Sequence, residues 1–323
     1  MFTLAELEAA LPIVHAAMPP TPQFAWPLLR QRTGVDVVVK HENHTPTGAF
    51  KVRGGLVYLE ALRRERPHVK GVVTATRGNH GQSLAFACHR AGIACTVVVP
   101  FGNSTEKNAA MRAFGAELIE HGRDFDEARE HAEVIARERG YEFGASFAKE
   151  LVLGVATYAH ELFSAERNLD AVFVPIGLGS GICGMIGARD ALGLRTQVFG
   201  VVAERANTYR LSREAGRLVP TNSALTFADG MAVRVPSADA FAIMQRGMAG
   251  LIEVTDDEIA EAIRILYTDT HTLAEGAGAA AFAALMRERE RLKGKRVAVI
   301  VSGQNIDHPW MTTVLTGGTP KAD

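Results

Sequence analysis

The chain has 323 residues, of which 47% are hydrophobic, and its 35 basic and 36 acidic residues leave a formal net charge of −1. Because the charges nearly balance, the chain has no long-range field to gather nucleic acid or an anionic membrane, and we expect neither as a partner. Its three cysteines, Cys88, Cys95 and Cys183, lack the paired spacing of a disulfide framework or a zinc knuckle, so we expect reduced, buried thiols.

Predicted strands and helices alternate along the chain. At the N-terminus, Glu6 and Glu8 stand where a secretory signal would carry positive charge, and no apolar run is long enough to cross a membrane. We therefore expect a cytoplasmic protein. The alternation predicts an α/β fold with parallel sheets covered by helices. Short β-branched runs predict strands at residues 35–40, 71–76, 95–100, 117–120, 171–176, 197–203 and 296–301.

The helix predicted over residues 256–268 has the clearest signature. Ile259, Ile263 and Leu266 share one face, and the sequence Thr-x-x-Glu at its start, residues 255–258, is typical of a capping box. No linker rich in Pro, Gly or Ser divides the chain, so a second domain is expected to be inserted. We predict a large domain from residues 1–54 and 147–323, a small domain from residues 55–146, and a ligand cleft between them.

The leading chemical candidate is a lysine in a strand-to-helix turn. Lys51 lies in the sequence PTGAFKVRGG, residues 46–55, which closes a strand and opens a helix. The positive helix start disfavours a protonated amine, so Lys51 is suited to condense with an aldehyde. Phe50 offers an aromatic face, and Thr47 is expected to cap the helix amides.

A second turn follows the strand predicted at residues 71–76. Its hydroxyl, amide and backbone N–H groups converge on a helix start, which suits a small carboxylate. An ordinary glycine-rich turn with an asparagine helix cap explains the same residues equally well, so both interpretations stay open at this point. The turn consists of Thr76, Arg77, Gly78, Asn79 and His80.

A third turn, after the strand predicted at residues 171–176, can surround a phosphate with backbone N–H groups. Residues 179–184 also spell GxGxxG, the dinucleotide fingerprint, and Glu204 ends the next strand where that motif has its ribose-binding acid. Two classes of function therefore compete, a nicotinamide oxidoreductase and an enzyme with a phosphorylated carbonyl cofactor. Only the second gives Lys51 and residues 76–80 a role. The turn consists of Gly177, Leu178, Gly179, Ser180 and Gly181, and its helix is expected to begin at Ile182.

A small polar turn follows the last predicted strand. Ser302 is suited to hydrogen-bond a buried ring nitrogen. Unlike an aspartate, a serine leaves that nitrogen largely unprotonated, which favours elimination over fuller carbanion chemistry. A plain serine turn at the end of a strand is the alternative.

Taken together, the segments PTGAFKVRGG, TRGNHGQS, GLGSG, AEGAGAA and SGQN, in this order, resemble the threonine/serine dehydratase family of fold type II pyridoxal-phosphate enzymes, which includes serine racemases. The resemblance covers roughly residues 20–310. It implies the fold of the tryptophan synthase β chain, with two open, twisted parallel sheets flanked by helices. It also implies pyridoxal 5'-phosphate as cofactor, a small amino acid as substrate, and a homodimer.

The resemblance also implies a role for each motif. Lys51 would carry the cofactor covalently, Phe50 would pack on its ring, and Ser302 would face the pyridine nitrogen. Asn79 would bond the ring hydroxyl. The remaining implied contacts are Gly177, Leu178, Gly179, Ser180 and Gly181 to the phosphate, Gly230 and Glu275 beside the ring, and Thr76, Arg77, Gly78, Asn79 and His80 to the substrate.

The implied activity is that of a dehydratase, or ammonia-lyase, that converts L-threonine or L-serine to a 2-oxo acid and ammonia. Dehydration of 3-hydroxyaspartate or phenylserine, and racemisation, are the alternatives. Racemases of this family have a serine where this chain has Arg77, and a guanidinium cannot accept the proton that this serine takes. Arg77 is suited to attract a second substrate carboxylate, and a structural ion pair explains it equally well.

The chain also departs from the metal-dependent members of the family. These bind a divalent ion with a glutamate and with an aspartate six residues later, whereas this chain has Glu204 and Arg210. We therefore expect no metal. Our hypothesis is that Arg210 lies near Glu204 and supplies the positive charge in its place.

Overall fold

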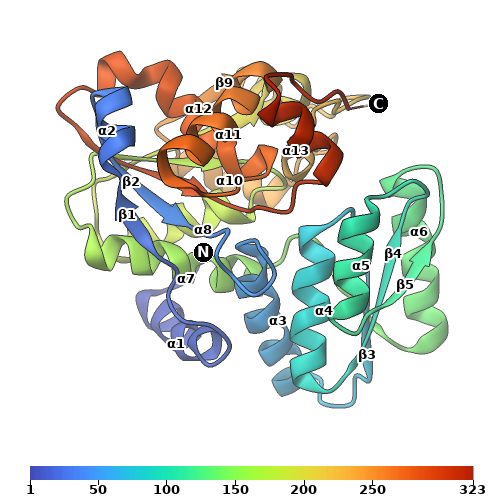
Figure 1. Cartoon of the computed structure of the whole chain (residues 1–323). Coiled ribbons are helices and arrows are strands. Elements are labelled where there is room, and N and C mark those ends of the chain that lie inside the picture. Colours follow the sequence, from blue (N-terminus) through green and yellow to red (C-terminus); the bar gives the residue numbers. More distant parts are fainter. Residues whose placement is uncertain (323) are drawn as a thin grey trace.

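The computed structural model describes residues 1–322. Within this range the strands form two sheets, a larger one in the order β1-β2-β10-β7-β8-β9 and a smaller one in the order β5-β4-β3-β6. Figure 1 shows the sheets in separate lobes, with helix α3 (Lys51–Glu65) running between them.

The strands run parallel to their neighbours, except that β1 is antiparallel to β2. The predicted α/β fold is thus confirmed. The larger sheet contains β1 (Gln23–Ala25), β2 (Asp36–His41), β7 (Ala171–Pro175), β8 (Gln197–Ala203), β9 (Gly250–Val254) and β10 (Arg296–Val301). The smaller sheet contains β3 (Gly71–Ala75), β4 (Ala94–Val99), β5 (Glu117–Glu120) and β6 (Glu142–Phe143).

The seven predicted strands are present to within one residue at either end, whereas β1, β6 and β9 were not predicted. β1 and β6 are very short, and β9 lies at a sheet edge with Gly250, Leu251 and Glu253 half-buried. Such strands lack the continuous buried run by which a central parallel strand is recognised.

Helices cover both sheets. The predicted capping box at the start of α11 (Asp256–Thr270) is confirmed, and this helix continues two residues beyond the predicted end. Within residues 1–322 no helix is long and apolar enough to cross a membrane. The other α-helices are α1 (Leu4–His15), α2 (Pro27–Thr33), α4 (Asn79–Ala91), α5 (Thr105–Ala113), α6 (Phe125–Arg139), α7 (Lys149–Ala165), α8 (Ser180–Ala191), α9 (Thr208–Ala215), α10 (Ala238–Gly247), α12 (Gly276–Glu288) and α13 (His308–Leu315).

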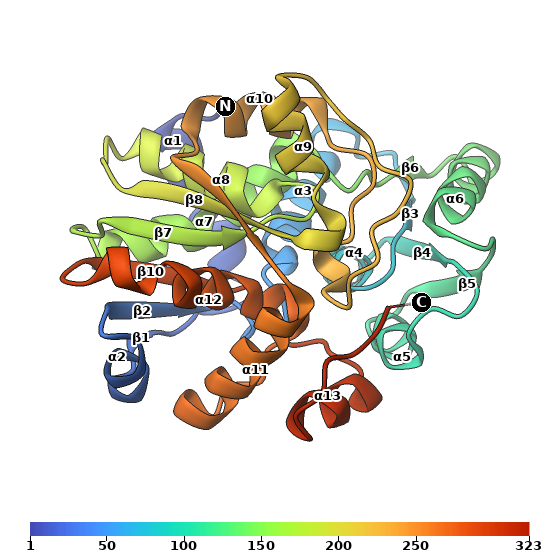
Figure 2. The ribbon, with the colours of Figure 1, turned by 90° about the horizontal axis from the view of Figure 1, so that it is seen from above.

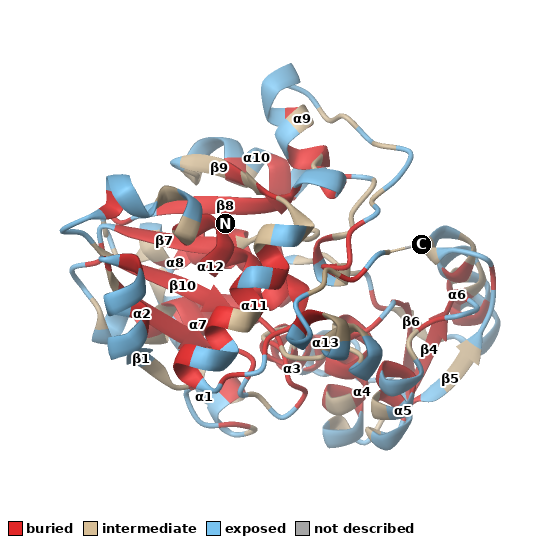
Figure 3. Ribbon diagram, turned by 45° about the horizontal axis from the view of Figure 1, so that its top comes forward, coloured by how far each residue is buried: buried red, intermediate tan, exposed pale blue. Residues whose placement is uncertain are grey.

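Successive residues of the larger sheet enter opposite cores. Val37 and Val39 of β2 pack in the cluster that contains α11 and α12, whereas Val38 packs in the cluster that contains α7 and α8. This is the alternation of a pleated strand that is buried on both faces. Each buried valine contributes about 1.5–3 kcal/mol to the free energy of folding. Figure 3 shows the central strands β7, β8 and β10 buried, while α2 is largely exposed and α6 and α9 combine buried and exposed residues.

The lobes meet through α3 and through polar contacts near α13. α3 packs against both α4 and α7, so the predicted boundary between residues 54 and 55 falls inside a continuous helix. Ser104 donates to Asp307 Oδ1 at 2.6 Å, and the N–H of His308 donates to Glu106 Oε1 at 3.0 Å. Figure 2 shows α13 beside the smaller lobe. The division into two domains stays a prediction.

The three cysteines are buried free thiols, as predicted. Burial raises the pKa of Cys183 to about 12, and a hydrogen bond with Cys95 together with burial raises the pKa of Cys88. Cys88 and Cys183 are therefore protonated at neutral pH, and the three buried thiols serve the packing.

Candidate active site

Lys51 is the first residue of α3 and lies beyond the end of β10. The N–H of Phe50 donates to the carbonyl of Ser302 at 3.0 Å, which ties this turn to the larger sheet. Lys51 Nζ donates to Ser180 Oγ at 3.0 Å and lies 5.1 Å from the centroid of the Phe50 ring. The amine therefore faces the start of α8.

The surroundings make the Lys51 amine easier to deprotonate. Burial lowers the pKa of Lys51 to about 8, and the charge of Glu275 opposes this shift only in part. At pH 7 about one such amine in ten is neutral, compared with far fewer than one in a thousand for an ordinary lysine. A neutral amine is the form that attacks a carbonyl carbon or accepts a proton.

Two glycines in the turn before α8, Gly177 and Gly179, are packed too tightly to carry a side chain. A Cβ atom at Gly177 would lie 2.2 Å from the carbonyl oxygen of Gly230, and one at Gly179 would lie 2.8 Å from the Cβ of Ala240. Gly179 also has a φ of +114°, which favours glycine. The carbonyl of Leu178 accepts a hydrogen bond from Tyr209 at 2.7 Å. α8 begins at Ser180, two residues before the predicted start, so the N–H groups of its first turn surround the space beside Lys51.

Asn79 connects the smaller lobe to the larger lobe. Its Nδ2 donates to Glu275 Oε1 at 2.8 Å, and its Oδ1 accepts from Asn305 Nδ2 at 2.8 Å. Asn305 Nδ2 also donates to the carbonyl of Thr47 at 2.9 Å. The expectation that Thr47 caps α3 is wrong, because its hydroxyl donates to the carbonyl of Ala49 at 3.4 Å, which directs it away from the helix amides.

Two buried polar groups, the carboxyl of Glu275 and the hydroxyl of Ser302, lie at the other side of the site. Burial raises the pKa of Glu275 to about 7, with Lys107 opposing the shift and Asp229 adding to it. Ser302 is buried, and its hydroxyl donates to the carbonyl of Ala277 at 3.3 Å. A Cβ atom at Gly303 would lie 2.5 Å from Glu275 Oε1, so a glycine here keeps the space beside the carboxyl open.

The turn at residues 76–80 is held by a hydrogen bond between two of its own residues. The N–H of Gly78 donates to Thr76 Oγ1 at 3.1 Å, and α4 begins at Asn79. His80 is buried, and burial together with the charge of Lys51 lowers its pKa to about 3, so the ring is neutral. Within residues 1–322, His80 Nε2 has no hydrogen-bond partner.

Arg77 and Lys107 converge on Asp229 from the smaller lobe. Lys107 Nζ lies 3.0 Å from Asp229 Oδ2, and Arg77 Nε lies 3.6 Å from Asp229 Oδ1. Burial would raise the pKa of Asp229, but the two cations hold it below its ordinary value. A Cβ atom at Gly78 would lie 2.8 Å from the Cδ of Lys107, so this lysine lies against the turn at residues 76–80.

The structure thus brings most of the predicted residues to one place, and it adds Asn305, Lys107 and Asp229. Asn305 is the last residue of the segment SGQN, and Asp229 directly precedes Gly230, so both positions could have been found from the sequence. Lys107 gave no signal, because a lysine in an amphipathic helix ordinarily points into solvent. The role of each site residue stays a prediction.

Beneath Lys51 lies a buried ionic network centred on Arg53. The Arg53 guanidinium donates to Glu42 Oε2 at 2.7 Å and to Glu161 Oε1 at 2.7 Å. Lys40 Nζ donates to Glu161 Oε2 at 2.7 Å. Burial would raise the pKa of Glu161, but Arg53 and Lys40 lower it to about 2. The charges balance in pairs, and the network anchors the first turn of α3 two residues after Lys51.

The hypothesis that Arg210 lies near Glu204 is wrong. Arg210 pairs with Glu214 at 2.9 Å and with Glu253 of β9. Arg210 and Glu214 border a surface cavity of about 550 Å³. α9 begins after Glu204 and turns the Arg210 side chain toward β9. Among residues 1–322, no three His, Cys, Asp or Glu side chains are grouped so as to hold a metal ion.

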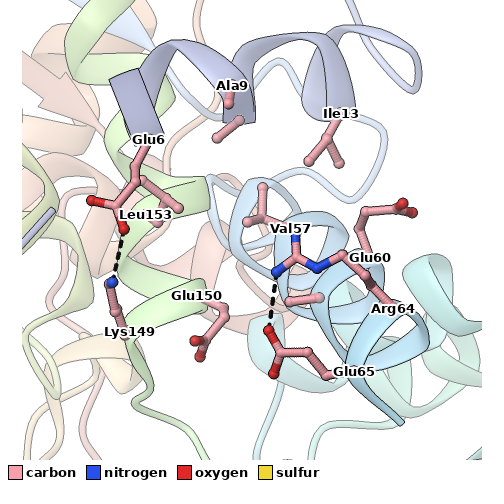
Figure 4. Close-up of a pocket in the computed structure, with 12 residues that line it drawn as sticks. Glu6, Ala9, Ile13, Val57, Glu60, Arg64, Glu65, Lys149, Glu150 and Leu153 are labelled. Carbon is pink, nitrogen blue, oxygen red and sulfur yellow. Dashed lines mark hydrogen bonds and ion pairs between the residues drawn. The ribbon is translucent and has the colours of Figure 1, made fainter. Parts of the chain in front are cut away.

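A second surface cavity, of about 240 Å³, lies between α1, α3 and α7 (Figure 4). Glu6 pairs with Lys149 at 2.9 Å, and Arg64 pairs with Glu65 at 3.0 Å. The cavity is lined by the second half of α3, not by Lys51.

Residues 14–303 match the family model described as pyridoxal-phosphate dependent enzyme. The chain belongs to this family. Its cofactor is pyridoxal phosphate, which excludes the nicotinamide oxidoreductase, and the chain is a pyridoxal-phosphate-dependent lyase of the threonine dehydratase type.

Individual relatives support the same family. The chain is 36% identical to an L-threonine ammonia-lyase of Geobacter sulfurreducens over 89% of this chain and 72% of the relative. It is 30% identical to an L-threo-3-hydroxyaspartate ammonia-lyase of Saccharomyces cerevisiae over 92% and 91%. The processed threonine deaminase isoform 2 of Solanum lycopersicum superposes with a TM-score of 0.89 at 30% identity, over 98% and 95%. The chain spans only 58% of the length of some related biosynthetic L-threonine dehydratases.

The residues of the site fit pyridoxal phosphate as the cofactor. Lys51 provides a partly buried amine of lowered pKa for the aldehyde. The turn of residues 177–181 provides backbone N–H groups and space for a phosphate. Phe50, Ser302 and Asn79 surround the space between them with a ring, a buried hydroxyl and an amide.

Proposed function

We propose that this enzyme is an ammonia-lyase for small β-hydroxy amino acids, with L-threonine or L-serine as substrate. The reaction removes the hydrogen at Cα and the hydroxyl at Cβ as water, and hydrolysis of the dehydrated product yields a 2-oxo acid and ammonia. The observation that carries the proposal is the position of Lys51, whose amine has a pKa of about 8 and lies between the turns that precede α4 and α8.

Pyridoxal phosphate, when bound, withdraws electrons from the substrate's Cα. The chain's own part is to hold and move protons. Lys51 Nζ accepts the proton from Cα, and the nearby Ser180 hydroxyl orients the amine. Thr76, Gly78 and Asn79 orient the substrate carboxylate. Ser302 leaves the ring nitrogen without an acidic partner, which favours elimination.

Elimination is favoured over racemisation by the residue at position 77. A racemase needs a second group that accepts or donates a proton on the opposite face of Cα. Arg77 is permanently protonated and is paired with Asp229, so it does not serve as a base. Phenylserine and 3-hydroxyaspartate remain alternatives as substrates.

The assay is a panel of L-serine, L-threonine, L-threo-3-hydroxyaspartate and L-phenylserine, with ammonia, 2-oxo acid and the D-enantiomer measured in each reaction. We expect ammonia and the 2-oxo acid in equal amounts, with little D-enantiomer. Formation of D-amino acid faster than ammonia would overturn the proposal in favour of a racemase.

A homodimer in the cytoplasm is part of the proposal. It is supported by the family resemblance and by the composition of the chain. Light scattering of the purified protein tests this proposal, because a homodimer has twice the chain mass of 34.7 kDa.

A further inference from the structure

We infer that Arg77 makes the site prefer β-hydroxy amino acids that carry a second carboxylate at Cβ, of which L-threo-3-hydroxyaspartate is the simplest. The inference rests on the proposed ammonia-lyase function and, among the β-hydroxy amino acids considered there, favours the alternative substrate 3-hydroxyaspartate over L-threonine and L-serine. It assigns Arg77 the role of a specificity-determining residue.

The position of Arg77 in the chain places it beside the substrate carboxylate. Thr76 and Gly78, its direct neighbours, form the turn that receives the carboxylate at Cα, and their own hydrogen bond of 3.1 Å fixes that turn. In such a substrate the two carbons that carry the carboxylates, Cα and Cβ, are directly bonded, so the second carboxylate lies close to the first. The Arg77 side chain begins between these two residues and extends to Asp229, which directly precedes Gly230. We therefore place its guanidinium within reach of that second carboxylate.

The charges around Arg77 do not cancel. Two cations, Arg77 and Lys107, share the single carboxylate of Asp229. The next carboxyl of the site, Glu275, accepts a hydrogen bond from Asn79 at 2.8 Å and is partly protonated at neutral pH. Lys107 also interacts with the charges of Glu275 and Asp307, whereas within residues 1–322 Asp229 is the one carboxylate that pairs with Arg77. Arg77 is therefore the cation of this group whose charge one additional carboxylate would neutralise.

Of the two cations, Arg77 is the one that can change partner. Lys107 is buried, with 9% of its side chain exposed, and lies 3.0 Å from Asp229. Arg77 has 56% of its side chain exposed and reaches Asp229 only at 3.6 Å, through Nε. Its terminal N–H groups thus stay available for the paired hydrogen bonds that a guanidinium makes with a carboxylate. The hydroxymethyl group of serine offers no such partner.

The test compares kcat/KM for L-threo-3-hydroxyaspartate and L-serine in the holoenzyme and in Arg77→Gln. We expect hydroxyaspartate to be the better substrate. Arg77→Gln should lower the ratio of the two kcat/KM values at least about tenfold, since a charge-assisted pair is lost for one substrate only. Loss of both activities in parallel would show a structural role and would overturn the inference.

Arg112→Gln is the matched control. Arg112 lies in the same lobe and has 53% of its side chain exposed, but it pairs with Glu120 of β5, at 3.7 Å, and not with Asp229. The ratio of kcat/KM values should be unchanged in this variant. An equal fall in both variants would trace the effect to the overall charge of the lobe and contradict the inference.

Binding of non-reacting acids separates this inference from the proposed function. Calorimetry of the holoenzyme should show tighter binding of succinate than of butyrate, and Arg77→Gln should remove the difference. If no β-hydroxy amino acid releases ammonia, the proposed function fails, while this difference still supports a site for dicarboxylates. Equal binding of succinate and butyrate in the unaltered enzyme would overturn the inference.

Discussion

The two sides of the site are built in different ways. On the cofactor side, the turn before α8 contains three glycines, of which Gly177 packs against the backbone of Gly230 and Gly179 against the side chain of Ala240, and it contains no charged side chain. On the substrate side, the turn before α4 contains Arg77 and meets Lys107 and Asp229 from other elements. The cofactor side is therefore set by backbone shape and the substrate side by paired charges.

This difference predicts how each side tolerates substitution. An atom added at Gly177 or Gly179 would meet Gly230 or Ala240, so the turn must shift and its contacts with the cofactor phosphate are weakened. A set of ion pairs exchanges partners at lower cost, so a substitution there changes which substrate is preferred. Lys51 joins the two sides, because its amine must serve both the cofactor and the substrate.

The largest effect is expected from Lys51→Ala. This variant removes the group that carries the cofactor and accepts the proton from Cα, so ammonia release should fall by at least about 10⁴-fold, the upper range for a general base. Circular dichroism should be unchanged. Lys149→Ala is the matched control, since Lys149 is also the first residue of a helix but pairs at the surface with Glu6. Residual activity in Lys51→Ala above about 1% would contradict the role of Lys51.

The support beneath Lys51 is tested by Arg53→Met. Removing a buried guanidinium leaves Glu42 and Glu161 without their partner, so the free energy of unfolding should fall by about 3–5 kcal/mol. Arg64→Met changes an exposed arginine of the same helix, paired with Glu65, and should cost less than about 1 kcal/mol. Urea unfolding at a fixed pyridoxal phosphate concentration measures both. Equal losses would mean that the network does not anchor α3.

The backbone pocket is tested by Gly179→Ala. The new Cβ would lie 2.8 Å from Ala240, and the φ of +114° is unfavourable for alanine, so the phosphate turn must shift. The dissociation constant of pyridoxal phosphate, from equilibrium dialysis, should rise about tenfold or more, equivalent to about 1.4 kcal/mol. Gly193→Ala is the control, because Gly193 also has a positive φ but has nothing within 4 Å of the added atom. A comparable rise in the control would contradict the steric argument.

The smallest effect is a shift in a pH profile. Burial lowers the pKa of Lys51 to about 8, so below this pH the neutral amine decreases about tenfold for each pH unit. The rate at which the apoprotein takes up pyridoxal phosphate should rise with pH and level off above about 8. Stopped-flow absorbance measures this rate. A rate that continues to rise toward pH 10 would show that the amine behaves as an ordinary exposed lysine.

Most of the larger sheet could be predicted from the sequence because its central strands are buried on both faces. After Gln197 and Arg296, residues 198–203 and 297–301 form uninterrupted apolar runs, and both strands were predicted at their observed ends. In an edge strand such as β9, half-buried residues interrupt the buried ones, and the strand pairs with only one neighbour, β8. A local sequence pattern therefore does not reveal it.

The site follows the same rule. The turns around Lys51 and Gly179 could be predicted because glycines and small residues in a fixed order are required by a backbone pocket. The pairing of Lys107 with Asp229 spans elements far apart in sequence and could not be predicted from either residue. Arg210 illustrates the converse, since its spacing from Glu204 suggested a contact that the direction of α9 prevents.

The most direct test of the central claim, that Lys51 carries the cofactor, is borohydride reduction of the holoenzyme followed by peptide mass mapping. The structure predicts a single pyridoxyl phosphate group on the peptide that contains Lys51, because this amine is partly buried, of lowered pKa and 3.0 Å from Ser180 at the phosphate turn. Reduction that labels another lysine, or none, would contradict it.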